Sequence, residues 1–239
     1  MAATELSTTP LASDANLKAY FKLEDVNDST ANAYNLTNHG TSTFTSAKFN
    51  NGGNFGSSGS GKYLSILNDL GITGGAITMV GWVKLLTELT GSGEYTFFSQ
   101  GDAGNKVTYR MDYEYNSGNP RLRAQRIRQG TSVDEVTYNT GGLGTSVFHQ
   151  LALVYDGSNL SAYMDGSLVA GPTAYSGNGS SGGADQFSIG AEETGAFGQN
   201  WSYAVIDDVA VFNRALTATE ISNLYNGFPV EGGYYFMSV

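Results

Sequence analysis

Hydrophobic and polar residues alternate along much of the chain with the two-residue period of β-strands. From Leu17 to Leu23, apolar residues occupy every second position, with lysines and a tyrosine between them. This alternation is typical of a strand that buries one face. Similar patterns predict strands over Ala76–Leu85, Tyr95–Ser99, Lys106–Tyr115, Arg121–Arg128, Phe148–Tyr155, Leu160–Met164, Gln186–Gly190 and Trp201–Asn213. Turn pairs such as Asp156-Gly157 separate these segments, which favours an all-β, two-sheet sandwich.

One short helix is predicted near the end of the chain. Thr217 and Glu220 have the spacing of a capping box, Ile221 and Leu224 then share one face, and Gly227 follows as a stop signal. A helix this short needs to dock on the rest of the protein to be stable.

The composition divides the chain into three parts. Residues 1–14 are small and polar, which predicts a flexible leader or linker. Residues 15–228 carry the strands and the helix and form the predicted domain. Residues 229–239 form an aromatic C-terminal tail, which we expect to be a final strand pressed on the domain or an edge for self-association.

Composition also excludes several classes of protein. The 239 residues include 32 glycines and 12% aromatic residues but only 14% charged ones, a balance typical of short strands and turns. A formal net charge of −10 argues against a nucleic-acid partner, which needs a basic surface. The absence of cysteine excludes disulfides, iron–sulfur clusters and cysteine nucleophiles.

The chain carries no sequence signal for a membrane. It has no apolar run long enough for a transmembrane helix, so no membrane insertion is expected. The opening residues lack the basic and apolar segments of a signal peptide. The sequence is therefore that of an intracellular protein or of one whose leader has been removed.

Three motifs that resemble catalytic or ligand sites are better explained by composition. Gly56–Lys62 fits the spacing of a phosphate-binding loop, but Tyr63 replaces the hydroxyl residue that would ligate magnesium, and a strand follows instead of a helix. Gly179–Gly183 matches a nucleophile elbow without the strand and helix that such an elbow needs. His39 and His149 belong to no metal-ligand pattern and are interpreted as structural.

Charged residues gather on one predicted hairpin. If residues 116–119 form its loop, Glu114 faces Arg121 and Asp112 faces Arg123, which predicts a charge-paired, exposed face. Exposed pairs contribute only about 0.2–1 kcal/mol each. The alternative is a basic strip for an anionic ligand such as a uronate or a sulfated sugar, because five of the six arginines lie here. The same count assigns no acidic partner to two of these arginines, Arg126 and Arg128.

Several segments together resemble the laminin-G-like, concanavalin A-like family of lectin and glucanase jelly rolls. The segments are Phe148–Gly157 (FHQLALVYDG), Leu160–Gly166 (LSAYMDG), Ile77–Lys84 (ITMVGWVK), Phe187–Gly190 (FSIG) and Ile206–Leu216 (IDDVAVFNRAL). The resemblance extends from about Ala15 to Gly227. It implies a two-sheet antiparallel jelly-roll β-sandwich.

The resemblance further implies a structural calcium ion where the opening segment meets the IDDV strand. Glu24, Asp28 and Asp207 are the oxygen donors expected to bind it, since calcium takes six to eight such ligands. Alternative donors are Asp25, Asn27 and Asp208. The alternative interpretation is that these residues serve as turn and cap residues.

For the ligand, the family implies carbohydrate or protein recognition. Aromatic rings stack on sugar C–H faces, and arginines bind anionic groups. The residues expected to bind the ligand are Tyr109, Arg126, Arg128, Trp201 and Tyr203. An ordinary core position is the alternative for each aromatic residue.

These observations predict a noncatalytic, calcium-stabilised recognition module of an extracellular or cell-surface protein, active in adhesion, that binds a glycan or a glycoprotein. One alternative is a structural or adhesive subunit of a surface appendage or virion. Another is a laminarinase-like glycoside hydrolase, which needs a Glu-x-Asp-x-Glu strand; Arg110 stands where the first glutamate would be, which argues against it.

Overall fold

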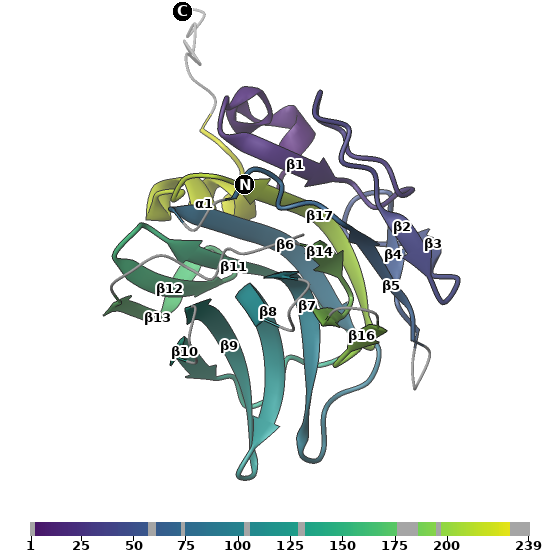
Figure 1. Ribbon diagram of the computed structural model, residues 1–239, viewed down its shortest axis with the longest axis vertical. Coiled ribbons are helices and arrows are strands. Elements are labelled where there is room, and N and C mark those ends of the chain that lie inside the picture. Colours follow the sequence, from purple (N-terminus) through teal and green to yellow (C-terminus); the bar gives the residue numbers. More distant parts are fainter. Residues whose placement is uncertain are drawn as a thin grey trace, which may run out of the picture.

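The protein is a sandwich of two antiparallel β-sheets, as a computed structural model shows (Figure 1). The structure describes residues 3–56, 61–72, 75–102, 106–128, 132–175, 186–194 and 197–229. The predicted all-β fold with one short C-terminal helix is confirmed.

The first sheet, called sheet A, has the strand order β13-β12-β11-β6-β17-β4-β3, and β1 also pairs with β17. Its strands are β1 (Leu17–Phe21), β3 (Thr43–Ser46), β4 (Asn51–Asn54), β6 (Ile77–Leu85), β11 (His149–Tyr155), β12 (Asn159–Met164), β13 (Ser167–Ala174) and β17 (Ala204–Phe212). The two central strands, β6 and β17, are almost entirely buried because one of their faces packs on sheet B and the other is covered by helical segments.

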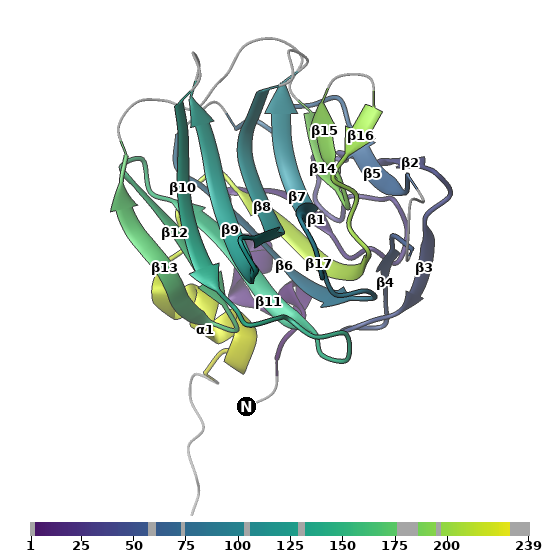
Figure 2. The same cartoon turned by 90° about the horizontal axis from the view of Figure 1, so that it is seen from below.

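The second sheet, called sheet B, has the order β10-β9-β8-β7-β14-β5-β2. Its strands are β2 (Thr37–His39), β5 (Tyr63–Ile66), β7 (Gly93–Asp102), β8 (Lys106–Asn116), β9 (Asn119–Arg128), β10 (Ser132–Asn139) and β14 (Gln186–Ile189). A separate hairpin of β15 (Glu192–Thr194) and β16 (Phe197–Gln199) lies beside β14 and β7 (Figure 2).

The main core fills the space between the two sheets. It is rich in aromatic residues, and Phe21 of β1 stacks on Phe187 of β14 with ring centroids 5.6 Å apart. Along β8 and β9, apolar residues that face the core alternate with charged residues that face outward, as the sequence pattern predicts. This core places the charged residues of β8 and β9 on the outer face of sheet B.

A second, smaller core lies on the outer side of sheet A. Helix α1 (Ala218–Asn226) packs there through Ile221 and Leu224, and the predicted capping box between Thr217 and Glu220 is present. Two 3-10 turns, η1 (Leu6–Thr8) and η2 (Pro10–Ser13), pack beside it. Figure 1 shows these turns and α1 along the same side of sheet A.

The N-terminal segment is therefore not the flexible leader that its composition predicts. Leu6 and Leu11 are buried in the second core. The backbone N–H of Leu6 donates to the Asp208 carboxylate (3.1 Å), and Asp14 forms an ion pair with Arg214. Two well-placed leucines and two polar anchors are enough to dock a segment that is otherwise small and polar.

Two other expectations concern the end of the chain and the membrane. Residues 230–239 lie outside the described residues, so self-association through the aromatic tail stays a prediction. Within the described part of the chain, no helix is long and apolar enough to cross a membrane.

Docking of the N-terminal segment can be tested by cavity formation. Leu6 is 1% exposed, so Leu6→Ala should lower the free energy of unfolding by about 2–5 kcal/mol in urea denaturation. Leu67 is 72% exposed, and Leu67→Ala should change it by less than about 0.5 kcal/mol. Equal, small effects of both substitutions would show that the segment is not docked.

Candidate functional site

Asp28, one of the three predicted calcium ligands, is fully engaged by the protein itself. Its Oδ1 accepts the backbone N–H groups of Tyr20 and Thr30, each at 2.9 Å. Its Oδ2 accepts the Thr30 hydroxyl at 2.7 Å and the Tyr34 N–H at 3.0 Å. Asp28 therefore holds the 28–34 loop against β1, which is the turn role that the sequence offered as the alternative to calcium binding.

Asp207 and Glu24, the other two predicted ligands, lie on either side of the hairpin turn between β3 and β4. Asp207 Oδ2 accepts the Phe49 N–H at 2.7 Å, and Glu24 Oε1 accepts from the Asn50 side-chain amide at 3.1 Å. Gly52 permits this approach, because a Cβ there would lie 2.7 Å from the Ile206 carbonyl oxygen. Two carboxylates from distant segments thus contact adjacent residues of one turn.

The Asp207 carboxylate has an unusual environment. Asp207 Oδ1 is buried and has no hydrogen-bond donor among the described residues. Burial raises the pKa of Asp207 to about 8, although the N–H of Phe49 favours the ionised form. No group of three or more His, Cys, Asp or Glu side chains in the described chain is arranged to hold a metal. A cation here would take its other ligands from carbonyls, amides and water.

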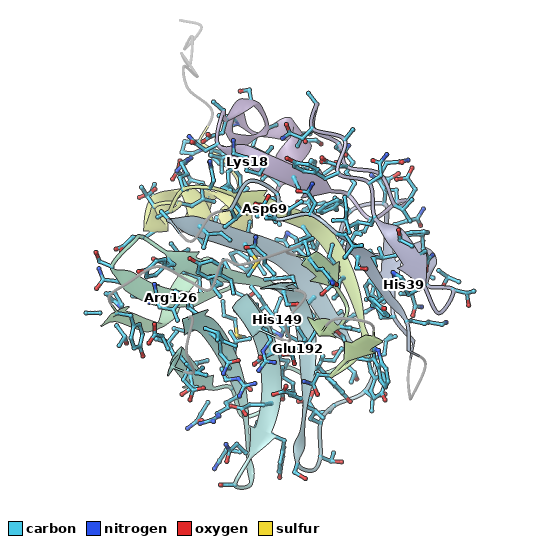
Figure 3. The ribbon with its side chains drawn as sticks, in the orientation of Figure 1. Lys18, His39, Asp69, Arg126, His149 and Glu192 are labelled. Carbon is cyan, nitrogen blue, oxygen red and sulfur yellow. The ribbon has the colours of Figure 1, made fainter. Side chains whose placement is uncertain are left out.

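Two of the predicted ligand-binding residues lie inside the sandwich. Tyr109 is buried, and its hydroxyl donates to the Gly75 carbonyl at 3.1 Å. Arg126 is also buried: its Nη2 is 2.7 Å from Asp134 Oδ2, and its guanidinium lies 4.3 Å from the centre of the Tyr155 ring (Figure 3). The expected contact of Tyr109 and Arg126 with an external ligand is therefore not what the structure shows.

The register explains why the acidic partner of Arg126 was missed. Arg126 faces Tyr109 on β8, as predicted, but faces Asp134 on its other side, in β10. The predicted hairpin joins only β8 and β9, and the sequence pattern did not predict β10, which carries Asp134. The side chain of Arg128 lies outside the described residues.

Trp201 and Tyr203 lie in the segment that leads into β17. Both are partly buried, and Tyr203 packs edge-on against Tyr95 with ring centroids 4.9 Å apart. The indole N–H of Trp201 is buried without a described acceptor. Tyr203 is thus part of the periphery of the main core, whereas Trp201 lies beside β7 at the outer face of sheet B.

The main polar feature of the molecule is an ion-pair network on the outer face of sheet B, called here the sheet-B network. The predicted pairs of Glu114 with Arg121 and of Asp112 with Arg123 are confirmed, in register and in contact. Arg123 bonds both oxygens of Asp112, at 2.8 and 3.1 Å, and reaches Glu114 at 3.1 Å. Arg110 pairs with Asp112 from the other side.

Three further residues complete the sheet-B network, and the sequence analysis did not predict them. Glu94 of β7 pairs with Arg110 and Arg123, and Glu192 of β15 pairs with Arg110. The side-chain amide of Asn200 donates to both glutamates. Figure 3 places Glu192 on the β15 segment over the central strands of sheet B.

The burial of this network contradicts the exposed face that the sequence predicted. Asp112 is fully buried, and Arg123 and Glu114 are less than one-tenth exposed. Burial raises the pKa of Asp112 to about 6, although Arg110 and Arg123 favour its ionised form. Glu94 and Arg121 are the most accessible charged members, with 20% and 24% of their side chains exposed.

The architecture and its polar outer sheet define a lectin-like β-sandwich. A family model described as the concanavalin A-like lectin/glucanases superfamily matches residues 57–222. The chain belongs to this superfamily. No curated protein matched the chain.

Solved structures share the fold at low sequence identity. Domain 4 of AbnA, a GH43 extracellular arabinanase from Geobacillus stearothermophilus solved with arabinotriose, is 19% identical, with a TM-score of 0.66, and the match covers 88% of this chain and 98% of that one. The binding domain of botulinum neurotoxin DC, solved with SialylT, is 13% identical, also with a TM-score of 0.66; the match covers 88% of this chain and 51% of that one. The chain thus spans about half of the toxin domain.

A more distant likeness is to a heptameric SAP-like pentraxin from Limulus polyphemus. It is 18% identical with a TM-score of 0.52, and the match covers 69% of this chain and 75% of that one. At these identities the likenesses establish the fold alone.

Burial predicts unequal contributions from the two arginines of the predicted pairs. Arg123→Ala leaves Asp112 buried with one partner fewer and should lower the free energy of unfolding by about 3–5 kcal/mol. Arg121→Ala, which removes a more exposed pair, should lower it by about 1 kcal/mol or less. Urea denaturation of both variants measures the difference. Equal losses would mean that the network is solvated like an ordinary surface.

Proposed function

We propose that the protein is a noncatalytic carbohydrate-binding module whose ligand lies on the outer face of sheet B. The observation that carries this proposal is the sheet-B network, a fixed array of carboxylates, guanidinium groups and an amide on one side of the sandwich. Such groups bind sugar hydroxyls through hydrogen bonds when they are held rigidly in place. Superfamily membership and the arabinanase domain solved with arabinotriose support the proposal.

The charge balance of the network favours a neutral sugar. Three arginines face four carboxylates, so the array is polar without being cationic. The predicted alternative of a basic strip for an anionic glycan finds no support on this face, because each of these arginines is paired. Trp201, which is bridged to Thr96 of β7, is the predicted aromatic residue that we propose a sugar ring approaches.

The same contacts argue against glycoside hydrolysis. A glycosidase needs one carboxyl that stays protonated to act as an acid and a second carboxylate that faces the sugar. Asp112 is buried between two arginines, and Glu114 is bonded by Arg121 and Arg123. Neither carboxylate has a free oxygen directed to a substrate.

We propose further that the module acts outside the cell or at its surface, in adhesion to a glycan or glycoprotein.

Glycan binding is tested with the full chain on a glycan array and by calorimetry with arabinotriose and the best neutral glycan found. Glu94→Gln and Arg121→Gln should each weaken binding about tenfold, because each removes a charged hydrogen-bonding group at the accessible edge of the network. Asp156→Asn, at the exposed turn between β11 and β12 of sheet A, is the matched control and should bind normally.

Two outcomes would contradict this function. A fully folded protein that binds no glycan, or one whose affinity is unchanged in both network variants, excludes the sheet-B site. Release of reducing sugar that disappears in Glu114→Gln would show that the module is catalytic.

We also propose that a calcium ion stabilises the domain between Glu24 and Asp207. Support comes from the buried Asp207 Oδ1, which has no described donor, and from the turn between β3 and β4, which contacts both carboxylates. A buried carboxylate oxygen without a partner is costly, and a cation would remove that cost.

The proposed calcium site predicts that Asp207→Asn raises the melting temperature in EDTA and abolishes the stabilisation by added calcium. With a dissociation constant of order 10⁻⁴ M, 10 mM calcium would stabilise the wild type by about 2.7 kcal/mol. At pH 9, above the pKa of about 8, the wild-type Asp207 side chain is charged in EDTA; Asp207→Asn removes this buried charge, so it should melt higher than the wild type there and should not respond to calcium. Glu135→Gln, an exposed carboxylate on β10, should keep the full response. A wild type that melts at the same temperature in EDTA and in calcium would exclude the site.

A further inference from the structure

A cavity of about 570 Å³ lies between the N-terminal segment, β1 and the loop 29–32. None of its lining residues belongs to the sheet-B network. Its floor is formed by Lys18 and Tyr20 of β1 and by Lys22, which follows the strand. One wall is the segment 12–15, and the other is the loop 29–32. This volume lies in the range of about 300–1,000 Å³ that is usual for small-molecule sites.

Hydrogen bonds hold both walls in place without a ligand. The Ser29 N–H donates to the Tyr20 carbonyl at 2.8 Å, and the Asn32 side-chain amide donates to the Lys18 carbonyl at 2.8 Å. On the opposite wall, Asp14 is bonded by Arg214. The cavity is therefore preformed, which reduces the entropy lost when a ligand binds.

Most charged groups at the cavity are paired with a charge of opposite sign, and Lys18 is the exception among the described lining residues. Lys22 lies 2.8 Å from Glu5, and the Asp14 carboxylate pairs with Arg214, which also pairs with Glu220. Lys18 is half-buried and forms no ion pair with the carboxylates of the described residues. Figure 3 shows Lys18 at the end of the molecule that the N-terminal segment forms. Its ammonium group is the cation available to a ligand.

We propose that this cavity binds an acidic sugar, with its carboxylate on Lys18 and its hydroxyl groups on the polar wall that includes Ser29 and Asn32. The proposal rests on the proposed carbohydrate-binding function but uses a different surface. All the residues that line the cavity precede residue 33, whereas the superfamily match begins at residue 57. The lining residues therefore lie outside the segment that the family model matches. A uronate fits better than a neutral sugar because a half-buried ammonium group gains more from a carboxylate than from a hydroxyl.

The experiment measures digalacturonate and arabinotriose binding by calorimetry with the full chain. Lys18→Gln should weaken digalacturonate binding about tenfold and leave arabinotriose binding unchanged. Lys62→Gln removes a partly exposed lysine outside the cavity and is the matched control, with normal binding of both sugars. Raising the salt concentration from about 0.1 to about 1 M should weaken digalacturonate binding in the wild type and have less effect in Lys18→Gln.

The two proposals fail separately. If digalacturonate does not bind, or binds equally to the wild type and Lys18→Gln, the cavity proposal is wrong, whatever the neutral sugars do. If digalacturonate binding depends on Lys18 while Glu94→Gln and Arg121→Gln change the binding of no glycan, the cavity proposal holds and the sheet-B site is wrong. Melting curves of each variant confirm that the protein compared is folded.

Discussion

A β-bulge in β17 inserts one extra residue opposite β6. At this bulge, the N-terminal segment of the domain is attached to its last strand. The pairing of β17 with β6 shifts between Asp207 and Ala210, and Asp208 has a φ of 53°. Ile206 and Val209 both face the core between the sheets although they are three residues apart. The extra residue keeps both aspartates out of that core. Without it, one carboxylate would be directed among aromatic side chains.

The two aspartates then serve different segments. Asp208 accepts the Leu6 N–H and the Tyr20 hydroxyl, so it holds the N-terminal segment on β1. Asp207 holds the turn between β3 and β4. Burial raises the pKa of Asp208 to about 7 as well, so two adjacent carboxylates are kept under conditions that disfavour their charge. The N-terminal cavity and the proposed calcium site both depend on this arrangement.

The sequence was most informative where a strand is long and buried on one face. The alternation in β1, β8 and β9 and the capping box of α1 predicted the elements that the structure contains. The short strands β2 and β3 and the edge strand β13 were missed because their residues are largely exposed and carry no hydrophobic period. Leu6 and Leu11 were missed because two isolated leucines in a polar segment do not indicate what they contact.

The candidate sites were predicted less completely, for reasons of the same kind. A count across one hairpin gave the partners of Arg121 and Arg123, since register is a local property. Burial of those pairs depends on Glu192 and Asn200, which approach from a distant segment that no local rule connects to β8. Asp28 is a residue type that commonly binds metals. Only the four hydrogen bonds that its carboxylate accepts in the structure show that it holds a turn.

The ion pair between Arg126 and Asp134 also fixes how the outermost strand of sheet B is aligned. A shift of β10 by two residues would keep the same side chains facing in and out, so hydrophobic patterning alone opposes it weakly. Such a shift would move Asp134 away from Arg126 and leave a guanidinium group buried without its carboxylate. The penalty for that isolated charge is large compared with any pairing that the shifted strand would regain. The pair therefore selects one alignment of an edge strand that would otherwise have several.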